Sequence, residues 1–311
     1  MFPVLGLFIL LATTSPAPPT APSPSPPSVQ PEFAPHSQPA LPFETVFVGL
    51  SRFEGLLKRA QDEKWETLPI GERTATIGRA LTGTPYLSHT LEIDDKIEAA
   101  SVNFSGLDCW TFFETALALA RLLDLPEKSR TPDNLLHFIE LDRYRDGRCT
   151  GAYLSRLHYL EDWGADNHRR GLVQDITGDL GGVEYENVCR EMTILWRGYR
   201  YLRATPSLVP AITREESRIQ KLKTLYISKG KVAAMESKLQ NGDIIGIVSR
   251  DGGRLSTSHV GLALRDKKGV LRFMHASSTR EKRKVLIDDR LSDYLAGNYG
   301  QAGITVWRPL K

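Results

Sequence analysis

One cysteine has a sequence neighbourhood that would suit a nucleophile. Cys109 follows Asp108, a good helix N-cap, and an apolar stripe that extends to Leu123 begins directly after it. We therefore expect the thiol in the first turn of a buried helix, where the helix dipole and unpaired N–H groups lower its pKa. The same N–H groups could receive a developing oxyanion. The alternative is a small buried hydrophobic residue, the usual role of a cysteine outside a disulfide.

A thiolate nucleophile needs a base within reach, and two histidines lie in the β-rich last third of the chain. His259 stands in STSHVGLAL and His275 in LRFMHASS, and apolar neighbours alternate about each of them. The alternation predicts strands in which both imidazoles could share one face of a sheet. For each histidine alone, the alternative is a partly buried ring bonded to backbone.

A series of short motifs surrounds these residues and has a fixed order along the chain. They are TGTPY (82–86), LDCWTFFE (107–114), GDIIGIV (242–248), SHVGLAL (258–264) and MHAS (274–277). The series resembles the NlpC-type superfamily of papain-like cell-wall hydrolases. The block 146–163, DGRCTGAYLSRLHYLEDW, and the ending 303–309, GITVWRP, are similar to its N-acetylmuramoyl-L-alanine amidase-like branch.

The resemblance implies a role for each residue of the candidate catalytic set. Cys109 would be the nucleophile that forms an acyl-enzyme, and His259 would be its general base. His275 would orient His259 through one ring hydrogen bond, and Asp108 would stand beside the nucleophile. Tyr86 would offer its hydroxyl near the oxyanion; the alternative is a tyrosine that only packs.

The block 146–163 concentrates polar and aromatic side chains, which commonly line a sugar or peptide cleft. We expect Arg156 to bind a substrate carboxylate through its two-pronged guanidinium, and Tyr153 and Trp163 to offer flat faces to a sugar ring. His158 falls on the family's histidine in this block, which implies a role at or next to the substrate. The alternative is a solvated amphipathic helix.

One segment departs from the family pattern. Members often carry Gly-Leu-Asp before the strand that bears the base, whereas this chain has GGRLSTSHVG. We interpret residues 249–257 as a loop whose substrate contacts differ from those of the family.

The implied reaction is hydrolysis of the amide between N-acetylmuramic acid, in its ordinary or anhydro form, and L-alanine. The alternatives are an endopeptidase that cuts the bond between γ-D-glutamate and a diamino acid, and an inactive wall-binding module. The implied partners are peptidoglycan fragments.

The hydrophobic patterns that must position these residues change along the chain. Helical periodicity recurs at residues 46–57, 74–81, 108–123, 132–144, 153–163, 186–202 and 213–225. Short β-rich runs follow at 243–248, 259–264, 271–275, 284–287 and 304–307. Helices followed by hairpin-connected strands predict an α+β fold, and the resemblance makes it papain-like, with the nucleophile's helix packed on an antiparallel sheet.

The N-terminal segment has a different character from the rest. An apolar run at 4–12 followed by small residues predicts a secretory signal over 1–15; since no Lys or Arg precedes it, an unusual tail is the alternative. Prolines crowd residues 16–42, which predicts a linker, and a single amidase domain should occupy 43–311. We expect a periplasmic or secreted monomer with no stable membrane insertion.

Composition excludes several classes of protein. A net charge of +3 without long basic runs provides no footprint for nucleic acid. The 7 histidines and 3 cysteines contain no His-x-x-x-His or Cys-x-x-Cys pair, so we expect neither a metal site nor a cofactor. Cys149 and Cys189 could form a disulfide in an oxidising compartment or remain two buried thiols.

Overall fold

The computed structural model describes residues 41–251 and 254–310, and the first of its helices is α1 (Phe43–Val46). The expected signal segment and nearly all of the expected linker lie outside the described residues. Contacts divide the chain at residues 37 and 38, so the description below concerns the second unit alone.

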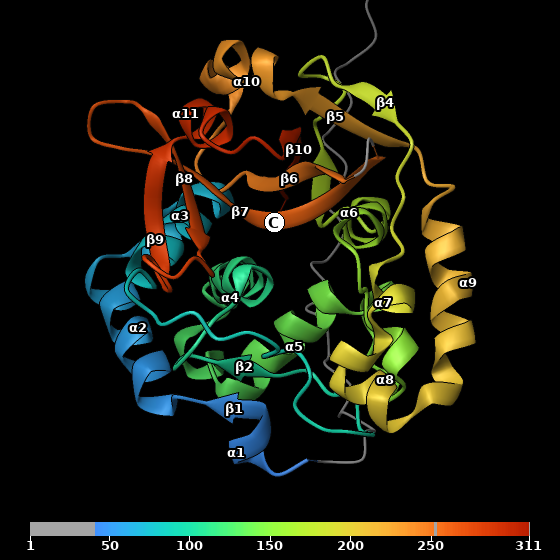
Figure 1. Ribbon diagram of the computed structural model, residues 1–311. Helices are drawn as coiled ribbons and strands as arrows, with labels where there is room; N and C mark the ends of the chain where they lie inside the picture. The colour runs from blue at the N-terminus through green and yellow to red at the C-terminus, as the bar shows by residue number, and fades with distance from the viewer. Residues whose placement is uncertain (1–40, 252–253, 311) are drawn as a thin grey trace, which may run out of the picture. The chain divides into compact units, whose positions relative to one another are not determined.

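An antiparallel sheet forms the centre of this unit (Figure 1). Its eight strands follow the order β4-β5-β10-β6-β7-β8-β9, and β3 also pairs with β10. The strands are β3 (Val173–Asp175), β4 (Val183–Tyr185), β5 (Thr224–Ser228), β6 (Ile244–Asp251), β7 (Arg254–Arg265), β8 (Leu271–Ala276), β9 (Val285–Arg290) and β10 (Gln301–Pro309). The predicted α+β class is therefore correct.

Helices cover both faces of the sheet. The others besides α1 are α2 (Leu50–Asp62), α3 (Ile70–Ala80), α4 (Cys109–Leu122), α5 (Pro132–Arg143), α6 (Leu160–Arg169), α7 (Glu191–Ile194), α8 (Arg200–Ala204), α9 (Val209–Ile219), α10 (Lys229–Met235) and α11 (Leu291–Ala296). Helices α3 and α4 lie on one side of the sheet in Figure 1, and α10 and α11 lie on the other. A small parallel pair, β1 (Phe47–Val48) and β2 (Val102–Asn103), stands apart.

Alternate residues of β7 belong to two different cores. Val260, Leu262 and Leu264 pack with α4, while Ala263 packs with the cluster under α10 and α11. A strand buried on both faces needs apolar side chains at successive positions, which explains the run VGLAL.

Helix α4 is the central element of the larger core. Its residues 111–122 are all buried, and it packs against α3, α5, β7 and β8. A helix that is surrounded in this way is apolar on every side, as observed. Its buried Glu114 pairs with Arg143 of α5 at 2.8 Å, so the one acidic side chain in this apolar helix is neutralised.

Several predicted helices are wrong in detail. Residues 153–163 do not form one helix: a 3₁₀ turn (Tyr153–Ser155) gives way to extended backbone at Arg156, which bridges to Tyr144, before α6 begins. The predicted helix 186–202 is broken into α7, a turn and α8, and the predicted helix 213–225 ends early and runs into β5. Strands β3, β4 and β5 were not predicted, because three-residue and five-residue strands leave little periodicity to detect.

Among the described helices, none has the length and apolar character required to cross a membrane.

Candidate active site

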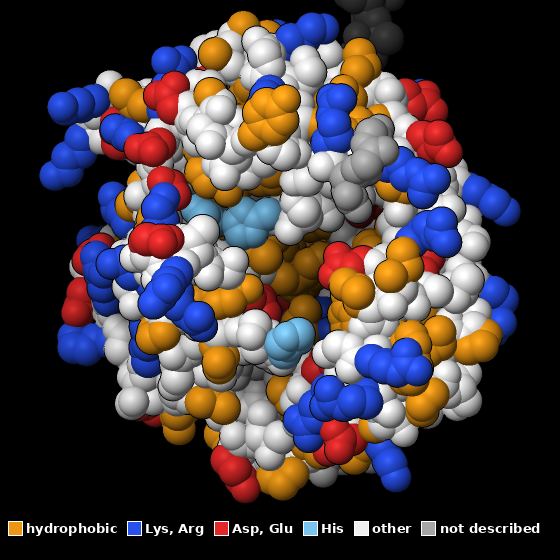
Figure 2. All heavy atoms as spheres, viewed as in Figure 1, with side chains coloured by type: hydrophobic (Ala, Val, Ile, Leu, Met, Phe, Trp, Pro, Cys, Tyr) orange, Lys and Arg blue, Asp and Glu red, His pale blue; other side chains and the backbone are white. Residues whose placement is uncertain are grey.

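A cavity of about 380 Å³ opens where the start of α4 faces β7, and Cys109 and His259 both line it. Its other walls come from residues 86–92, 153–160 and 191–199. Figure 2 shows this face hollowed at its centre, with histidine side chains on two sides of the hollow. The helix and the strand are more than 130 residues apart in sequence, so only the packing of α4 on the sheet brings the thiol and the imidazole into one cleft.

Asp108 holds the start of α4 in place. Its Oδ1 accepts the Thr111 N–H at 2.7 Å, and the Asp108 N–H donates to Oγ1 of Thr111 at 3.0 Å. Oδ2 of the same carboxylate accepts the hydroxyl of Thr90 at 3.0 Å. This reciprocal capping box places Cys109 in the first helical position, as the sequence predicted.

The pKa of the Cys109 thiol differs from the sequence expectation. Burial, reinforced by the Asp108 carboxylate, raises this pKa to about 12, although N–H groups of Val260, Trp110 and Cys109 itself act to lower it. The position at the helix start therefore does not ionise the resting thiol, because desolvation raises its pKa more than the helix dipole lowers it. The Val260 N–H belongs to the residue after His259, so the thiol lies against the strand that carries the imidazole.

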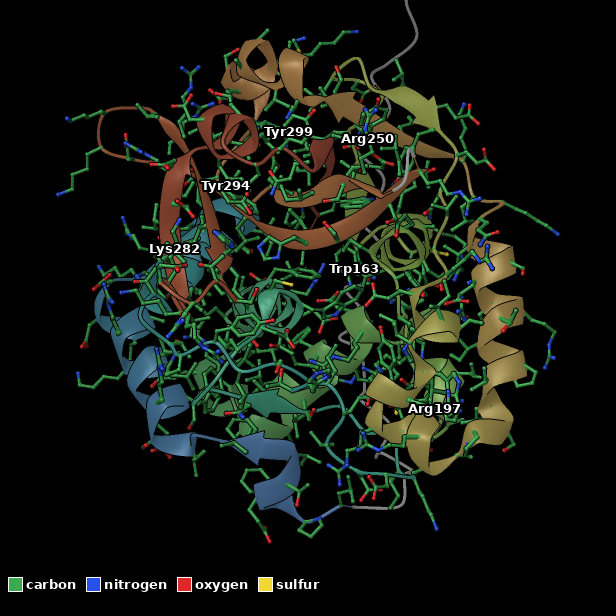
Figure 3. All side chains as sticks on the ribbon, in the orientation of Figure 1. Trp163, Arg197, Arg250, Lys282, Tyr294 and Tyr299 are labelled. Atoms are coloured by element: carbon green, nitrogen blue, oxygen red, sulfur yellow. The ribbon has the colours of Figure 1, made fainter. Side chains whose placement is uncertain are left out.

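A line of hydrogen-bonded polar side chains begins at His259, which lines the cleft. Nε2 of His259 lies 2.7 Å from Nδ1 of His275, and Nε2 of His275 lies 3.1 Å from Oδ2 of Asp288. Lys282 donates to the same oxygen at 2.6 Å. Figure 3 labels Lys282 beside β9, the strand that carries Asp288. The structure thus brings the two predicted histidines together and adds Asp288 and Lys282, which the sequence did not single out.

These contacts decide which nitrogen atoms carry protons. Hydrogen bonds from His275 and Lys282 lower the pKa of Asp288, which is therefore an ionised acceptor. His275 must then donate from Nε2, and burial lowers its pKa and keeps it neutral, so its Nδ1 is an acceptor. His259 consequently donates from Nε2. Its Nδ1 is left without a proton and is the nitrogen available to act as a base.

Burial also lowers the pKa of His259, to about 3, and a neighbouring imidazole adds to the effect. The resting site accordingly holds a neutral thiol and a neutral imidazole. A proton must pass from the thiol to the imidazole for a nucleophile to form.

Two β-bulges lie next to residues of this line, one beside His259 and one at Asp288 or Asp289. The β6–β7 register shifts between Ile247 and Val248, which places an extra residue, Ser258, directly before His259. The β8–β9 register shifts between Arg272 and Met274, so that the extra residue on β9 falls at Asp288 or Asp289. Bulges redirect side chains near functional sites, and both of these adjoin the line of polar contacts.

Tyr86 joins three parts of the site. It bridges in parallel to Leu107, just before α4, and its N–H donates to the Arg283 carbonyl in the β8–β9 connection at 2.9 Å. Its side chain lines the cleft, and burial raises its pKa to about 12. The hydroxyl therefore remains protonated and can donate a hydrogen bond.

The structure does not support Arg156 as a substrate clamp. The side chain is only 4% exposed, and its guanidinium forms ion pairs with Glu92 at 3.5 Å and Glu98 at 3.3 Å. It also lies over the ring of Tyr153, whose hydroxyl donates to Glu92 at 2.5 Å. The positive charge of Arg156 is therefore neutralised by two glutamates inside the wall of the cleft.

The expected sugar-stacking faces are likewise absent from the surface. Trp163 is fully buried between Phe113 and Trp307, so its assignment to the cleft was wrong. Gly164 permits this packing, since a Cβ there would meet the Trp307 ring. Tyr153 borders the cleft but is 1% exposed, with one face stacked on Tyr201.

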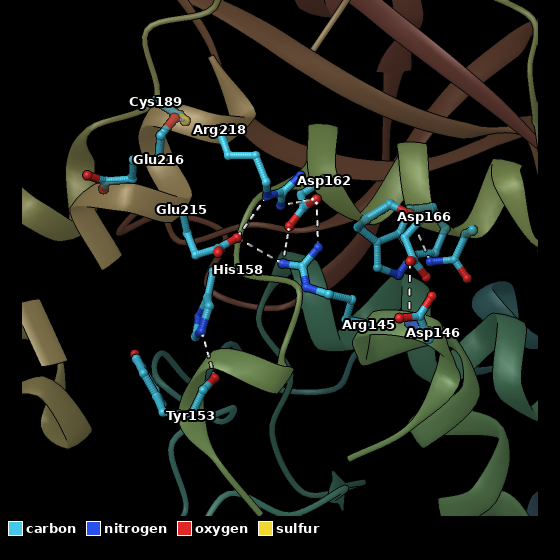
Figure 4. Close-up of polar contacts among 12 residues, drawn as sticks. Arg145, Asp146, Tyr153, His158, Asp162, Asp166, Cys189, Glu215, Glu216 and Arg218 are labelled. Carbon is cyan, nitrogen blue, oxygen red and sulfur yellow. Dashed lines mark hydrogen bonds and ion pairs between the residues drawn. The ribbon is translucent and has the colours of Figure 1, made fainter. Parts of the chain in front are cut away.

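His158 lines the cleft from the same wall. Its Nε2 lies 2.9 Å from the Tyr153 carbonyl oxygen, as Figure 4 shows, so this nitrogen donates. Burial and the nearby Arg156 hold its pKa well below the usual range. Behind it, Arg145 and Arg218 both pair with Asp162, which fixes the start of α6.

The other two cysteines, Cys149 and Cys189, do not line the cavity that Cys109 lines. No disulfide joins Cys149 and Cys189 in the described structure, so of the two alternatives it shows the buried thiols. Their sulfur atoms lie 3.4 Å from the Glu98 carbonyl and 3.5 Å from the Glu216 carbonyl. Within the described ranges, no group of three or more His, Cys, Asp or Glu side chains has a geometry that could hold a metal ion.

Comparisons with known proteins agree with this fold. A model of the AmiA-like family, described as N-acetylmuramoyl-L-alanine amidase-like, matches residues 76–303. The crystal structure of an N-acetylmuramoyl-L-alanine amidase from Bacteroides uniformis is 31% identical, with a TM-score of 0.69, and the match covers 78% of this chain and 99% of that one. The comparison with curated proteins gave no match.

Two further solved structures are similar. A Bacteroides fragilis protein provisionally called a xylanase is 31% identical over 75% of this chain and 99% of its own, with a TM-score of 0.65. A Legionella pneumophila protein has a TM-score of 0.62 over 84% of this chain and 94% of its own, and at 20% identity it speaks for the fold alone.

Proposed function

We propose, from the premise that this chain belongs to the N-acetylmuramoyl-L-alanine amidase-like family, that it hydrolyses the amide between N-acetylmuramic acid and L-alanine. The anhydro form of the sugar is included in the proposal. The observation that carries it is the cleft itself, in which a thiol at a helix start shares a cavity with an imidazole backed by His275 and Asp288. In this proposal the fold is papain-like in its use of a helix-borne cysteine and a sheet-borne histidine.

The first step would form an acyl-enzyme. Nδ1 of His259 takes the proton of the Cys109 thiol as sulfur attacks the carbonyl carbon of the sugar's lactyl group. The resulting imidazolium donates its proton to the alanine nitrogen as the carbon–nitrogen bond breaks. A thioester and a free peptide amine result, and His259 returns to its neutral form.

The oxyanion of this step needs hydrogen-bond donors already in position. The main-chain N–H groups at the start of α4 are unpaired by the helix itself, and the Tyr86 hydroxyl is a protonated donor on the same cleft. His259 then takes a proton from water, which attacks the thioester and releases the sugar's carboxylate and the thiol. The Asp288–His275 pair maintains the required tautomer of His259 throughout.

A glycosidase reading of the cleft has less support. Such enzymes use two carboxyl groups on either side of a sugar bond, one of them free to give a proton. Glu92 and Asp108 line the cleft, but each is held by several donors, including Arg156 on Glu92 and the Thr111 N–H on Asp108. These contacts favour structural roles for both carboxylates.

The proposal extends to place and partner. Peptidoglycan fragments as substrates agree with the predicted export signal, which would deliver a monomeric enzyme to the periplasm or the medium. These statements rest on the sequence expectation, since residues 1–40 lie outside the described part of the chain.

Mass spectrometry of a digested muropeptide would test the reaction. The substrate is muramoyl-L-alanyl-γ-D-glutamyl-diamino acid, with ordinary or anhydro sugar. Release of a tripeptide that begins with L-alanine supports the amidase. Release of the free diamino acid, with muramoyl-L-alanyl-D-glutamate as the other product, would instead indicate the endopeptidase.

Two variants assign the activity to the proposed nucleophile. Cys109→Ser should lose about a thousandfold or more of kcat, because a hydroxyl is far less acidic than a thiol. Cys149→Ser is the matched control, since Cys149 is a buried thiol outside the cleft, and it should stay active. Activity in Cys109→Ser above about a tenth of wild type would refute the assignment.

A further inference from the structure

A second cavity, also of about 380 Å³, adjoins the catalytic cleft. The two cavities share Tyr159, Glu191 and Thr257 as walls. Thr257 lies two residues before His259 on β7, so the second cavity begins about 7 Å along the strand from the base. A ligand that leaves the catalytic cleft in this direction enters the second cavity directly.

Two arginines line this second cavity, and both are exposed. The side chains of Arg190 and Arg254 form no ion pair or hydrogen bond with any other residue that the structure describes. The arginine that lines the catalytic cleft, Arg156, is by contrast buried and paired with two glutamates. The available positive charge is therefore beside the cleft and not in it.

Main-chain contacts hold the two arginines on neighbouring segments. Asn187 bridges in parallel to Leu255, and the Val188 N–H donates to the Leu255 carbonyl at 3.2 Å. Arg254 directly precedes Leu255, and Arg190 follows Val188 by two residues. Two guanidinium groups on paired segments can bind one carboxylate together or two adjacent carboxylates separately.

An apolar wall stands beside these charges. Ile194 is 64% exposed and Leu195 is 56% exposed, and both line the second cavity. Large apolar side chains this exposed at the rim of a cavity suit a ligand with aliphatic parts. Charge and apolar surface together describe a short acidic peptide with methyl or methylene groups.

The distances fit a substrate that extends from the scissile amide. Arg254 is five residues from His259 on β7, which corresponds to about 16 Å along a strand. An extended peptide advances about 3.5 Å per residue, and a γ-linked glutamate advances farther. The carboxylates of the second and third residues of a stem peptide therefore reach the region between the base and Arg254.

We propose that this cavity is the subsite for the acidic stem peptide on the leaving-group side of the scissile amide, with Arg190 and Arg254 as its specificity residues. The proposal rests on the proposed amidase function, since that reaction places L-alanine and the residues after it on this side. It assigns to these two arginines the carboxylate recognition that the sequence had suggested for Arg156.

Calorimetric binding of the free tripeptide L-alanyl-γ-D-glutamyl-diamino acid tests the subsite without any need for catalysis. Wild-type protein should bind it, and each of Arg190→Met and Arg254→Met should weaken binding about tenfold, the effect of losing one charge-assisted contact. A tripeptide with all its carboxylates amidated should bind the wild type as weakly as the acidic one binds the double variant. Arg250→Met is the matched control, an exposed arginine on β6 that lines neither cavity, and it should bind normally.

Kinetics separate this proposal from the amidase proposal. On the acidic muropeptide both arginine variants should raise KM with little change in kcat, whereas muramoyl-L-alanine without further residues should be cleaved equally by all proteins. Arginine-dependent tripeptide binding without cleavage of either substrate would leave the subsite standing and remove the amidase function. Absence of tripeptide binding, or equal binding by wild type and double variant, would overturn the subsite.

Discussion

His275 donates from Nε2 to the Asp288 carboxylate across 3.1 Å, and this one contact determines which nitrogen atoms of His275 and His259 carry protons. Because Asp288 accepts at Nε2, the other nitrogen of His275 must accept from His259. Nδ1 of His259 is therefore the free base. The side chains of His259 and His275 separate the Asp288 carboxylate from the thiol. Asp288 nevertheless decides which nitrogen of His259 is free to receive the thiol's proton.

Asp288→Asn should reverse this pattern. An amide can donate to Nε2 of His275, which would shift protons along both imidazoles and leave His259 protonated at Nδ1. We expect kcat on the muropeptide to fall about a hundredfold or more, the scale of general-base catalysis, with KM nearly unchanged.

Lys282→Gln is the control for that experiment. It removes the cation from the same carboxylate but leaves the acceptor, and the Lys282 side chain is 41% exposed. The loss in kcat should stay below about tenfold, because exposed ion pairs contribute little. Equal losses in the two variants would mean that charge, and not the tautomer, is what Asp288 supplies.

The raised pKa of Cys109 predicts how the rate of thiol alkylation depends on pH when His259 is absent. In His259→Ala, alkylation by iodoacetamide should rise about tenfold per pH unit from pH 7 to pH 9, because the thiolate is the reactive form. Burial raises the pKa of this thiol to about 12, so the alkylation rate should not level off between pH 7 and pH 9. Peptide mapping by mass spectrometry would follow Cys109 separately from the two buried cysteines, and a plateau below pH 8 would contradict the expectation.

Arg156 should matter for stability and not for substrate binding. Arg156→Met leaves Glu92 and Glu98 buried without their cation, which should lower the free energy of unfolding by about 3–5 kcal/mol. Arg190→Met, at an exposed position, should change it by no more than about 0.5 kcal/mol. Urea denaturation of both variants measures the difference. An Arg156→Met variant that is as stable as wild type but has a raised KM would instead support Arg156 as the residue that binds the substrate carboxylate.

The low pKa of His259 predicts a dependence of stability on pH. Its folded pKa is about 3, below its ordinary value of 6.5. Between these values the unfolded chain binds a proton that the folded chain does not, so this residue makes stability fall as the pH is lowered through that window. Wild type should therefore lose stability relative to His259→Gln between pH 7 and pH 4.5 in urea titrations, and parallel profiles for the two proteins would contradict this.

Much of the chain's local structure could be read from residue patterns. Asp108 before an apolar stripe predicted α4 to within a residue of its start, because capping and helical periodicity are local effects. The strands around His259 and His275 were predicted for the same reason, but the loop expected over 249–257 was wrong, because β6 and β7 continue their pairing through Asp251 and Arg254. The stretch 153–163 was not, since its aromatic and polar side chains serve tertiary contacts with Glu92, Tyr201 and Trp307 that no local pattern encodes.

The sequence by itself determined the α+β class and the family, and it singled out Cys109, His259 and His275 as the proposed catalytic set. Tertiary structure alone decided that Arg156 and Trp163 are buried, that burial outweighs the helix dipole at Cys109, and that Asp288 extends the line of polar contacts from His259. The reason is register. A side chain on a strand changes face with a shift of one residue, and the bulge in β9 that lies next to Asp288 exists only when β8 and β9 pair.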